Sequence, residues 1–248
     1  MLSKAKIKYI LSLQKKKIRI KEQVFIVEGE KIVAEVLNQN QFKVHSIYAT
    51  EIWINKNIAI ATQYRTKLTT ILPKELKKIS SLKSPNQILA VIETPNNTPL
   101  VKNIQNSLNL VLENIQDPGN MGTIIRIADW FGIPHIFCSE GCVDVYNSKV
   151  IQATMGSFLR VKIQYIALEE LFLEHSSMTV YGAVLGGKNA YKTDLKDTGF
   201  LLIGNEGKGL SKSIQKKISH PITIPKTGKA ESLNAAVATG ILCAFFKQ

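Results

Sequence analysis

Apolar segments of strand length alternate with helical patterns through the second half of this 248-residue chain, and no other feature limits its fold as strongly. These segments are residues 109–115, 135–139, 160–166, 178–185, 200–206 and 221–225. Parallel strands need long crossover connections, usually helical, so the alternation predicts a mostly parallel sheet with helices on both faces. In such sheets ligands bind beyond the carboxyl ends of the strands. We therefore expect the loops that follow the strands to hold the chemistry.

The first ninety or so residues show a shorter version of this pattern. Predicted strands are residues 24–29, 43–50, 58–62 and 87–94, and helical patterns fill residues 30–39 and 73–82. A segment rich in proline and asparagine follows, which is typical of a linker. The sequence thus predicts a small α/β domain at 1–94, a linker at 95–107 and a larger α/β domain at 108–248.

Positive charge is concentrated in the first of these domains. The chain has 32 Lys and Arg against 19 Asp and Glu, a net charge of +13. Residues 1–100 hold 17 basic and 7 acidic residues, and residues 1–21 hold eight basic residues and no acidic one. Such a charge favours a polyanionic partner, and nucleic acid fits better than an anionic membrane surface.

The cysteines and the apolar segments bear on the cellular compartment and on whether the chain holds a metal ion. Three cysteines form an odd, sparse set, which favours reduced thiols and a cytoplasmic protein. No apolar run approaches the ~20 residues that a membrane-spanning helix needs, and the basic amino terminus lacks the apolar core of a signal peptide. The cysteines and the four histidines are too scattered for a zinc site, so we expect no metal.

The first loop of interest follows the strand at 109–115 and reads "QDPGNMGTIIRIADWFGI", residues 116–133. Helical spacing of apolar residues begins at Ile124, and Arg126 lies within the apolar stripe. The preceding Asp-Pro-Gly-Asn-Met-Gly segment is rich in turn formers and carries Asn120. An arginine on such a helix usually lies at the edge of the stripe with its head in water, and that simple interpretation remains open.

Two further loops follow later strands. "LLIGNEGKGLS", residues 201–211, has three glycines in six residues, which lets the backbone approach a ligand closely. "TIPKTGKAESLNAAVATGILCAFF", residues 223–246, offers Ser232 as a helix N-cap and exposed amides that suit an anion. Taken singly, a glycine-rich turn is more often a tight loop, and Ser-Leu-Asn before an alanine-rich run is most often only a cap.

Two familiar nucleotide-binding motifs are absent. Residues 182–189, "GAVLGGKN", nearly match the phosphate-binding loop, but Asn189 replaces the hydroxyl residue and no apolar helix follows. The dinucleotide fingerprint G-x-G-x-x-G does not occur. An ordinary nicotinamide enzyme is therefore not expected.

The three loops, in this order, resemble the three motifs of the SpoU family of RNA ribose 2'-O-methyltransferases, within the superfamily of knotted methyltransferases. Motif one is similar to "NIQDPGNMGTIIRIADWFGI", motif two to "LLIGNEGKGLS" and motif three to "IPKTGKAESLNAAVATGIL". The amino-terminal half, with "FIVEGEKIVAEVL" and "SPNQILAVIET", is similar to the small substrate-binding domain often attached to this family.

The resemblance implies an α/β fold whose carboxyl-terminal parallel-sheet domain contains a deep trefoil knot, a rare exception to unthreaded connections. It implies S-adenosyl-L-methionine as cofactor and a homodimer packed through helices of the knotted region. The positions that it implies for cofactor binding are Gly204, Ile224, Leu233, Ala183, Leu185, Asn205 and Gly209.

The resemblance also implies the catalytic residues Asn120, Arg126, Glu206, Ser232 and Asn234. A ribose 2'-hydroxyl is a poor nucleophile, so the site must hold it close and stabilise negative charge on its oxygen. A guanidinium has a pKa above about 12, so we expect Arg126 to act by donating hydrogen bonds and not as a base. Glu206 would orient Arg126 or bind the nucleotide, and the remaining three would hold ribose and phosphate.

The basic amino-terminal domain fits an RNA-holding role, because phosphate contacts position a substrate without reading its sequence. Ribosomal RNA is the preferred substrate and transfer RNA the second. Two rival interpretations remain at this point. One is a catalytically inactive RNA-binding or ribosome-assembly protein, and the other is a methyltransferase that acts on an RNA base.

Overall fold

The computed structural model describes residues 2–39, 41–95 and 104–247. The chain forms two compact units, a first unit of Met1–Asn97 with Tyr146–Gly156 and a second unit of Thr98–Val145 with Ser157–Gln248. Most of the linker predicted at 95–107 falls on residues 96–103, which lie outside the described residues.

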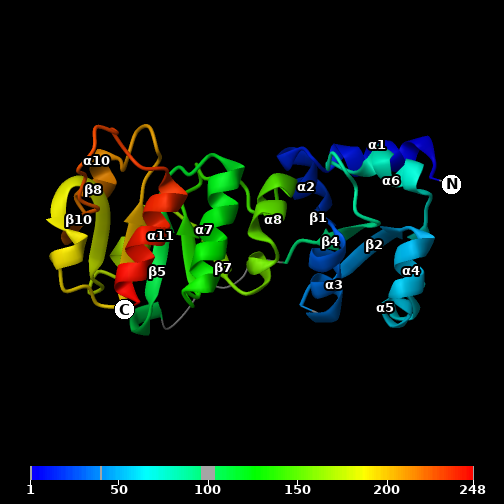
Figure 1. The fold of residues 1–248 in the computed structure, drawn as a ribbon, viewed down its shortest axis with the longest axis horizontal. Coiled ribbons are helices and arrows are strands. Elements are labelled where there is room, and N and C mark those ends of the chain that lie inside the picture. Colours follow the sequence, from blue (N-terminus) through cyan, green and yellow to red (C-terminus); the bar gives the residue numbers. More distant parts are fainter. Residues whose placement is uncertain (1, 40, 96–103, 248) are drawn as a thin grey trace. The chain divides into compact units, whose positions relative to one another are not determined.

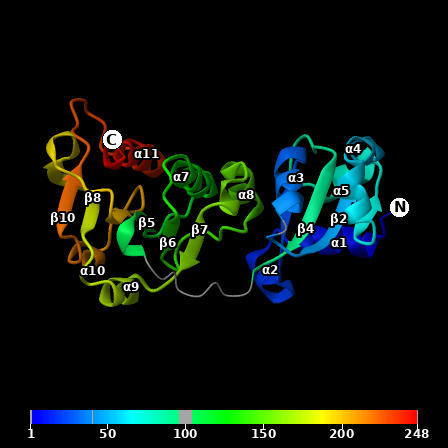
Figure 2. The ribbon, with the colours of Figure 1, turned by 90° about the horizontal axis from the view of Figure 1, so that it is seen from below.

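The first unit is built on a four-stranded mixed sheet in the order β1-β4-β2-β3. Its strands are β1 (Val24–Glu28), β2 (Val44–Ala49), β3 (Leu68–Thr70) and β4 (Ile88–Glu93). β4 pairs antiparallel with β1 and β2, whereas β3 pairs parallel with β2. One face is covered by α1 (Lys4–Ser12), α2 (Lys16–Glu22) and α6 (Pro73–Ile79), and the other by α3 (Glu30–Gln39), α4 (Glu51–Lys56) and α5 (Ile58–Gln63) (Figures 1 and 2).

One strand predicted in this unit is wrong. Residues 58–62 alternate Ile and Ala, yet they form helix α5. Ala61 is buried, and three residues later the Tyr64 hydroxyl donates a hydrogen bond to the Leu37 carbonyl (3.0 Å). Contacts at this spacing fit a helix, so packing overrode the alternating pattern. The strands predicted at 24–29, 43–50 and 87–94 are confirmed as β1, β2 and β4.

Helix α8 (Ser148–Thr154) lies in the first unit, although the sequence places it within the larger domain. The rings of Tyr146 and Phe25 lie 4.5 Å apart between centroids. The Gln152 amide donates to the carbonyl oxygen of Glu28 (2.6 Å). These contacts join segments more than 100 residues apart in the sequence, so local patterns carry no sign of them.

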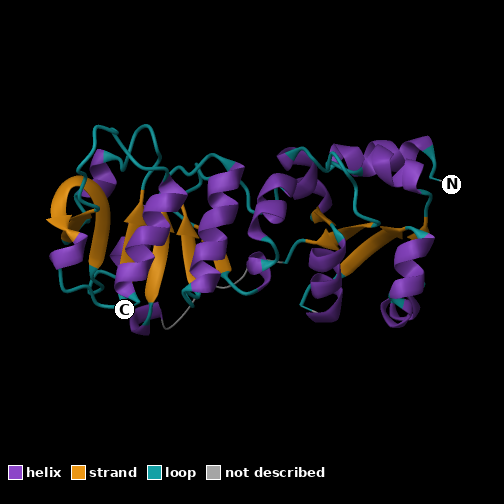
Figure 3. Cartoon of the chain, viewed as in Figure 1, coloured by secondary structure: helices purple, strands orange, loops and turns teal. Residues whose placement is uncertain are grey.

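The second unit contains a six-stranded sheet in the order β10-β8-β9-β5-β6-β7, with every neighbouring pair parallel. Its strands are β5 (Leu108–Leu112), β6 (His135–Cys138), β7 (Lys162–Tyr165), β8 (Val180–Asn189), β9 (Gly199–Ile203) and β10 (His220–Thr223) (Figure 3). The predicted parallel sheet is therefore confirmed. Short 3-10 turns occur at η1 (Ile104–Asn106), η2 (Ser157–Leu159) and η3 (Ala190–Lys192).

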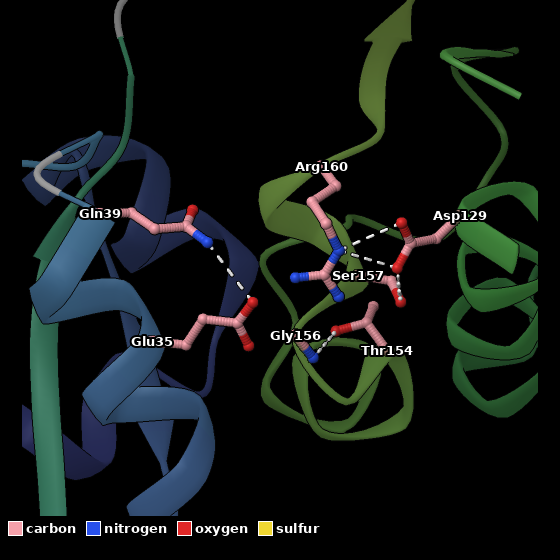
Figure 4. Close-up of polar contacts among 7 residues, drawn as sticks. All are labelled: Glu35, Gln39, Asp129, Thr154, Gly156, Ser157 and Arg160. Atoms are coloured by element: carbon pink, nitrogen blue, oxygen red, sulfur yellow. Dashed lines mark hydrogen bonds and ion pairs between the residues drawn. The ribbon is translucent and has the colours of Figure 1, made fainter. Parts of the chain in front are cut away.

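Helices cover both faces of this sheet, because its strands are apolar on both sides. α7 (Pro118–Trp130) and α11 (Ala235–Phe246) pack side by side on one face (Figures 1 and 2). α9 (Leu168–Glu174) and α10 (Lys212–Gln215) lie on the other, where Phe200 stacks edge-on against Phe137 and Phe172. At the end of α7, Asp129 accepts hydrogen bonds from Ser157 and Arg160, which fastens the helix to η2 (Figure 4).

A buried polar cluster joins the amino ends of three strands in this sheet. Asn109 on β5 is fully buried, and its Nδ2 lies within hydrogen-bond distance of the carbonyl oxygens of Ile104, Ser107 and Gly199 (2.7–3.2 Å). Its Oδ1 lies 3.1 Å from Nδ1 of buried His135 on β6. Burial, with the nearby charge of Lys162 as a smaller cause, lowers the pKa of His135.

Two kinds of feature are absent from the described residues. No helix there is both long and apolar enough to cross a lipid bilayer. Nor do three or more His, Cys, Asp or Glu side chains gather there in a group that would hold a metal ion.

Candidate active site

The three loops of interest follow β5, β9 and β10, at the carboxyl ends of these parallel strands. The first begins helix α7, which starts at Pro118 and not at Ile124 as the sequence predicted. Asp117 is the N-cap, and its carboxylate accepts a hydrogen bond from the Asn120 backbone N–H (2.8 Å). Proline suits the first helical position because its missing N–H would have no helical partner there. The helix start therefore places Asn120 in its first turn.

A chain of side-chain hydrogen bonds joins the three loops. The Asn234 amide donates to the side-chain oxygen of Asn120 (2.8 Å), and the Asn120 amide donates to the Glu206 carboxylate. Asn120 is 86 residues from Glu206 and 114 from Asn234 in sequence. The fold thus gathers three of the five expected catalytic residues, one from each loop. Glu206 and Asn120 are half-buried and Asn234 is exposed, so the chain of bonds borders solvent.

Asn234, and not Ser232, caps helix α11. Its side-chain oxygen accepts from the backbone N–H groups of Ala236 (3.0 Å) and Val237 (3.2 Å). The prediction of Ser232 as N-cap is therefore wrong. Ser232 is exposed two residues before the cap, and in the part of the chain that the structure describes it makes no bond to Asn120, Glu206 or Asn234. An asparagine side chain is as good a cap as serine, which sequence spacing alone did not resolve.

Arg126 lies away from this chain of hydrogen bonds. It is exposed, in a row with Gly119, Thr123 and Trp130 at helical spacings of three and four, and the Trp130 side chain is 85% exposed. The expectation that Arg126 sits within the apolar stripe is wrong, because the buried side of α7 is formed by other positions. Six residues of helix put Arg126 about 9 Å beyond Asn120 and on a different side of the helix.

Asn205 organises the glycine-rich loop after β9. Its side-chain oxygen accepts from the backbone N–H groups of Gly207 (3.0 Å) and Lys208 (3.1 Å), while its amide donates to the Asn114 carbonyl (3.0 Å). The loop is thereby shaped from inside and fastened to the end of β5. Sequence reasoning expected Asn205 only as a cofactor contact, although an asparagine ahead of two glycines is a known turn signal.

Two residues that the sequence did not suggest support the same loops. The carboxylate of buried Glu113 accepts from the Ser211 backbone N–H (2.8 Å) at the start of α10. Cys142 Sγ accepts from the Ile115 N–H (3.3 Å) and donates to the Leu112 carbonyl (3.3 Å). A hydrogen bond with the Cys138 thiol lowers the pKa of Cys142 to about 7. Neither Glu113 nor Cys142 has a sequence signal that marks this role. Asp117 does have one, because it directly precedes a proline at the start of a helix and is therefore a typical N-cap.

The other expected cofactor positions after β9 and β10 combine two features. Glycines allow two backbone segments to lie close together, and apolar side chains remain partly open to solvent. A Cβ on Gly204 would lie 2.5 Å from the Gly209 carbonyl carbon, so only glycine lets these backbone segments meet, and Gly209 has φ +65°. Ile224 is half-buried after β10, and Leu233 is 46% exposed.

β8 leaves its regular pairing at the other two expected cofactor positions. Gly182 pairs with Pro221 and Lys188 with Ile222, so residues 183–187 have no strand partner. This segment contains half-buried Ala183 and Leu185, whose side chain is 79% exposed. Exposed apolar side chains next to a glycine-containing loop suit the adenosyl group of the cofactor, which has a flat ring system and a ribose.

Comparison with known families agrees with this geometry in both halves of the chain. Residues 107–244 match the SpoU rRNA Methylase family, and residues 4–90 match the MRM3-like substrate binding domain. The chain is similar to the 23S rRNA (guanosine(2553)-2'-O)-methyltransferase RlmP of Bacillus subtilis, with 30% identity over 96% of this chain and 94% of that protein.

Solved structures share the whole architecture. A protein described as an RNA methyltransferase of the TrmH family from Porphyromonas gingivalis is 36% identical, with a TM-score of 0.88 over all of this chain and 98% of that one. An AdoMet-bound rRNA methyltransferase from Sinorhizobium meliloti is 26% identical, with a TM-score of 0.88 over 99% of this chain and 96% of that one. With both family matches and a 30% identical relative aligned over 94% of its length, this chain belongs to the SpoU family of RNA methyltransferases.

Proposed function

We propose that this protein transfers a methyl group to a ribose 2'-oxygen in structured RNA, with ribosomal RNA as its substrate. The observation that carries the proposal is the hydrogen-bonded chain Asn234–Asn120–Glu206, with Asn120 at its centre, at the carboxyl ends of β5, β9 and β10. The similarity to RlmP, a 23S rRNA 2'-O-methyltransferase, supports the same reaction and ribosomal RNA over transfer RNA.

S-adenosyl-L-methionine, when bound, supplies an electrophilic methyl group on a sulfonium. Gly204, Asn205 and Gly209 after β9, Ile224 and Leu233 after β10, and Ala183 and Leu185 on β8 are the residues that we assign to holding it. The loop that Asn205 shapes keeps its backbone fixed before the cofactor arrives. A fixed loop binds more tightly because less ordering is needed on binding.

The polar residues act on the ribose. Asn120 and Asn234 hold the ribose and the neighbouring phosphate by hydrogen bonds, and Ser232 adds a hydroxyl at the exposed edge of the site. The Asn120 amide holds the Glu206 carboxylate in position, where it accepts hydrogen bonds from Arg126 or from the nucleotide. Arg126 donates hydrogen bonds to the 2'-oxygen as negative charge develops there, which lowers the barrier without requiring the guanidinium to lose a proton.

The separation of Arg126 from the other catalytic residues supports a homodimer. The outer sides of α7 and α11 expose Trp130 (85%) and Val237 (51%), which are costly to leave in water. A second copy packed on this surface brings Arg126 of one subunit towards Asn120, Glu206 and Asn234 of the other. The threading of the carboxyl-terminal segment into a trefoil knot is part of the same proposal, supported by the match of residues 107–244 to the SpoU family. The reduced, buried cysteines support a cytoplasmic location.

The first test is methyl transfer from labelled S-adenosyl-L-methionine to an unmodified 23S ribosomal RNA transcript, with transfer RNA in parallel. Digestion to nucleosides and mass spectrometry should find a 2'-O-methylated nucleoside. A methylated base would refute the ribose assignment. Cofactor binding without product on any ribosomal or transfer RNA would refute the substrate class, and no binding at all would favour an inactive RNA-binding protein.

Mixed dimers test whether the site is shared between subunits. Arg126→Ala and Glu206→Ala, each inactive alone, should regain about a quarter of wild-type activity when unfolded and refolded together, because some dimers then contain one intact site. If Arg126 acts within its own subunit, every site keeps one lesion and no activity returns.

A further inference from the structure

The layer of helices α1, α2 and α6 in the first unit carries a dense set of lysines directed to solvent. These exposed lysines, called the lysine face below, are Lys4, Lys8, Lys15, Lys16, Lys17, Lys21, Lys74, Lys77, Lys78 and Lys83. The three helices contain ten basic and two acidic residues. One of the two acids, Glu75, is buried and accepts hydrogen bonds from the backbone N–H groups of Leu2 and Leu72, so only Glu22 offsets the charge outside.

The opposite layer of the same unit is different. Helices α3, α4 and α5 contain Lys31 and Lys56 against Glu30, Glu35 and Glu51. The net charge is therefore +8 on one layer and −1 on the other, although both cover the same sheet (Figures 1 and 2). A basic composition alone does not explain this one-sided distribution.

Several of the lysines lie where positive charge disfavours a helix, although Lys21, Lys77 and Lys78 are in last turns, where the helix dipole favours them. α1 and α2 have no acidic residue in their first turns, where the helix dipole favours negative charge, and α2 begins with Lys16 and Lys17. Lys4 with Lys8, and Lys74 with Lys78, are like charges four residues apart, which repel along a helix. A bound polyanion would relieve each of these repulsions.

The lysines also lie together in space. α1 packs against α6, and one buried cluster contains Ile10 of α1, Leu13 directly after α1, and Leu76 and Ile79 of α6. With the apolar sides of the helices buried in this way, their lysine rows point outward as neighbours. Few large apolar side chains are exposed there, namely Leu11, Ile20 and Leu72, and they are separated in the sequence, so the surface lacks the continuous apolar side that a membrane-binding helix inserts.

Two basic residues of this layer have internal roles and are not part of the lysine face. Arg19 is buried, and its guanidinium donates to the carbonyl oxygens of Leu13 (3.0 Å) and Gln14 (2.8 Å). The Lys6 ammonium lies over the ring of Tyr9, 5.4 Å from its centroid. The lysines that remain are free of such roles in packing and can reach phosphates.

We propose that the lysine face is the surface on which the first unit holds the phosphate backbone of the substrate RNA, while the opposite layer makes no contact with it. The inference rests on the proposed function and adds the side of the unit that meets RNA. Contacts of this kind hold the RNA without reading its sequence and release counterions, so the affinity falls steeply with salt.

The test compares two triple variants of the full chain that remove equal charge from the two layers. K74Q/K77Q/K78Q changes the lysine face, and K31Q/K56Q/R65Q changes exposed residues on the opposite side. Binding to an unmodified 23S ribosomal RNA transcript is measured across a salt series, alongside S-adenosyl-L-methionine binding and folding. The first variant should bind about 10-fold or more weakly, with the slope of log affinity against log salt reduced by about 2 to 3. The second should change affinity less than about threefold.

K4Q/K8Q provides an independent check on α1 and should weaken binding in the same direction. Equal losses in both triple variants, or no loss in either, would overturn the inference. The inference would also be overturned if K74Q/K77Q/K78Q bound RNA as well as the wild type but lost binding to vesicles of phosphatidylcholine and phosphatidylserine. That result would assign the lysine face to a membrane. Failure of the proposed function looks different: the wild type would bind RNA and transfer no methyl group, whatever the lysine variants did.

Discussion

At the amino ends of the parallel strands in the second unit, buried Asn109 joins three segments of chain next to buried His135. At the carboxyl ends, Asn120, Glu206 and Asn234 form an equally connected chain that borders solvent. Both ends use asparagine amides to connect distant segments. The difference in burial separates their roles, because a buried amide stabilises the fold, whereas an open one can exchange its partners for a ligand.

The largest effect that would sharpen this comparison comes from Arg126. We expect Arg126→Ala to lower kcat/KM for RNA methylation by about 100- to 1000-fold, the usual loss when a donor to a developing oxyanion is removed. S-adenosyl-L-methionine affinity, measured by calorimetry, should stay the same. Thr123→Ala, on the same exposed row of α7, is the matched control and should lose little. Full methylation by the Arg126 variant would remove Arg126 from the mechanism.

At the opposite end of the sheet, Asn109→Ala should reduce the free energy of unfolding by about 2–3 kcal/mol, since it removes a fully buried amide donor that lies within hydrogen-bond distance of three backbone carbonyl oxygens. Urea unfolding followed by circular dichroism measures this loss. The folded fraction should keep normal kcat, because Asn109 lies at the strand ends away from the candidate site. A variant with unchanged stability and reduced kcat would break the division of roles between the two ends.

Asn205 tests whether the loop after β9 must be shaped in advance. Asn205→Ala should raise the KM for S-adenosyl-L-methionine about 10-fold, a cost of about 1.4 kcal/mol in a typical range for lost hydrogen bonds. In Asn205→Asp the side chain still accepts from the N–H groups of Gly207 and Lys208 and loses only the bond that it donates to the Asn114 carbonyl. Its KM should therefore lie between those of the wild type and Asn205→Ala. Equal KM values in all three proteins would show that the loop forms without these bonds.

The smallest effect is the pH dependence from His135. Burial holds its pKa below the ordinary value of about 6.5, so below that pH the unfolded chain binds more protons than the folded one. Stability therefore rises with pH through this window and is lost as the pH falls. The urea midpoint should drop between pH 7.5 and 5.5 in the wild type and drop less in His135→Gln. A larger drop in the variant would mean that the folded state favours the charged ring.

Local sequence was enough for the parts of the site that depend on neighbours along the chain. The strand and helix alternation predicted the parallel sheet, and the glycines at 204 and 209 marked a backbone that must approach closely. Local sequence gave the wrong prediction where two local structures were about equally favourable. Asn234 caps α11 in place of Ser232, and Ile58–Gln63 is helical although its alternating pattern favours a strand.

The sequence by itself determined the order of the elements, the positive charge of the first unit and the residue types available in the three loops, because each depends on composition or short-range spacing. Only the tertiary structure decided that Asn120, Glu206 and Asn234 meet, that Arg126 faces outward, and that the lysines share one layer. These contacts join residues far apart in the chain, and the energy that selects them comes from packing of whole helices and strands. No local window of sequence contains that information.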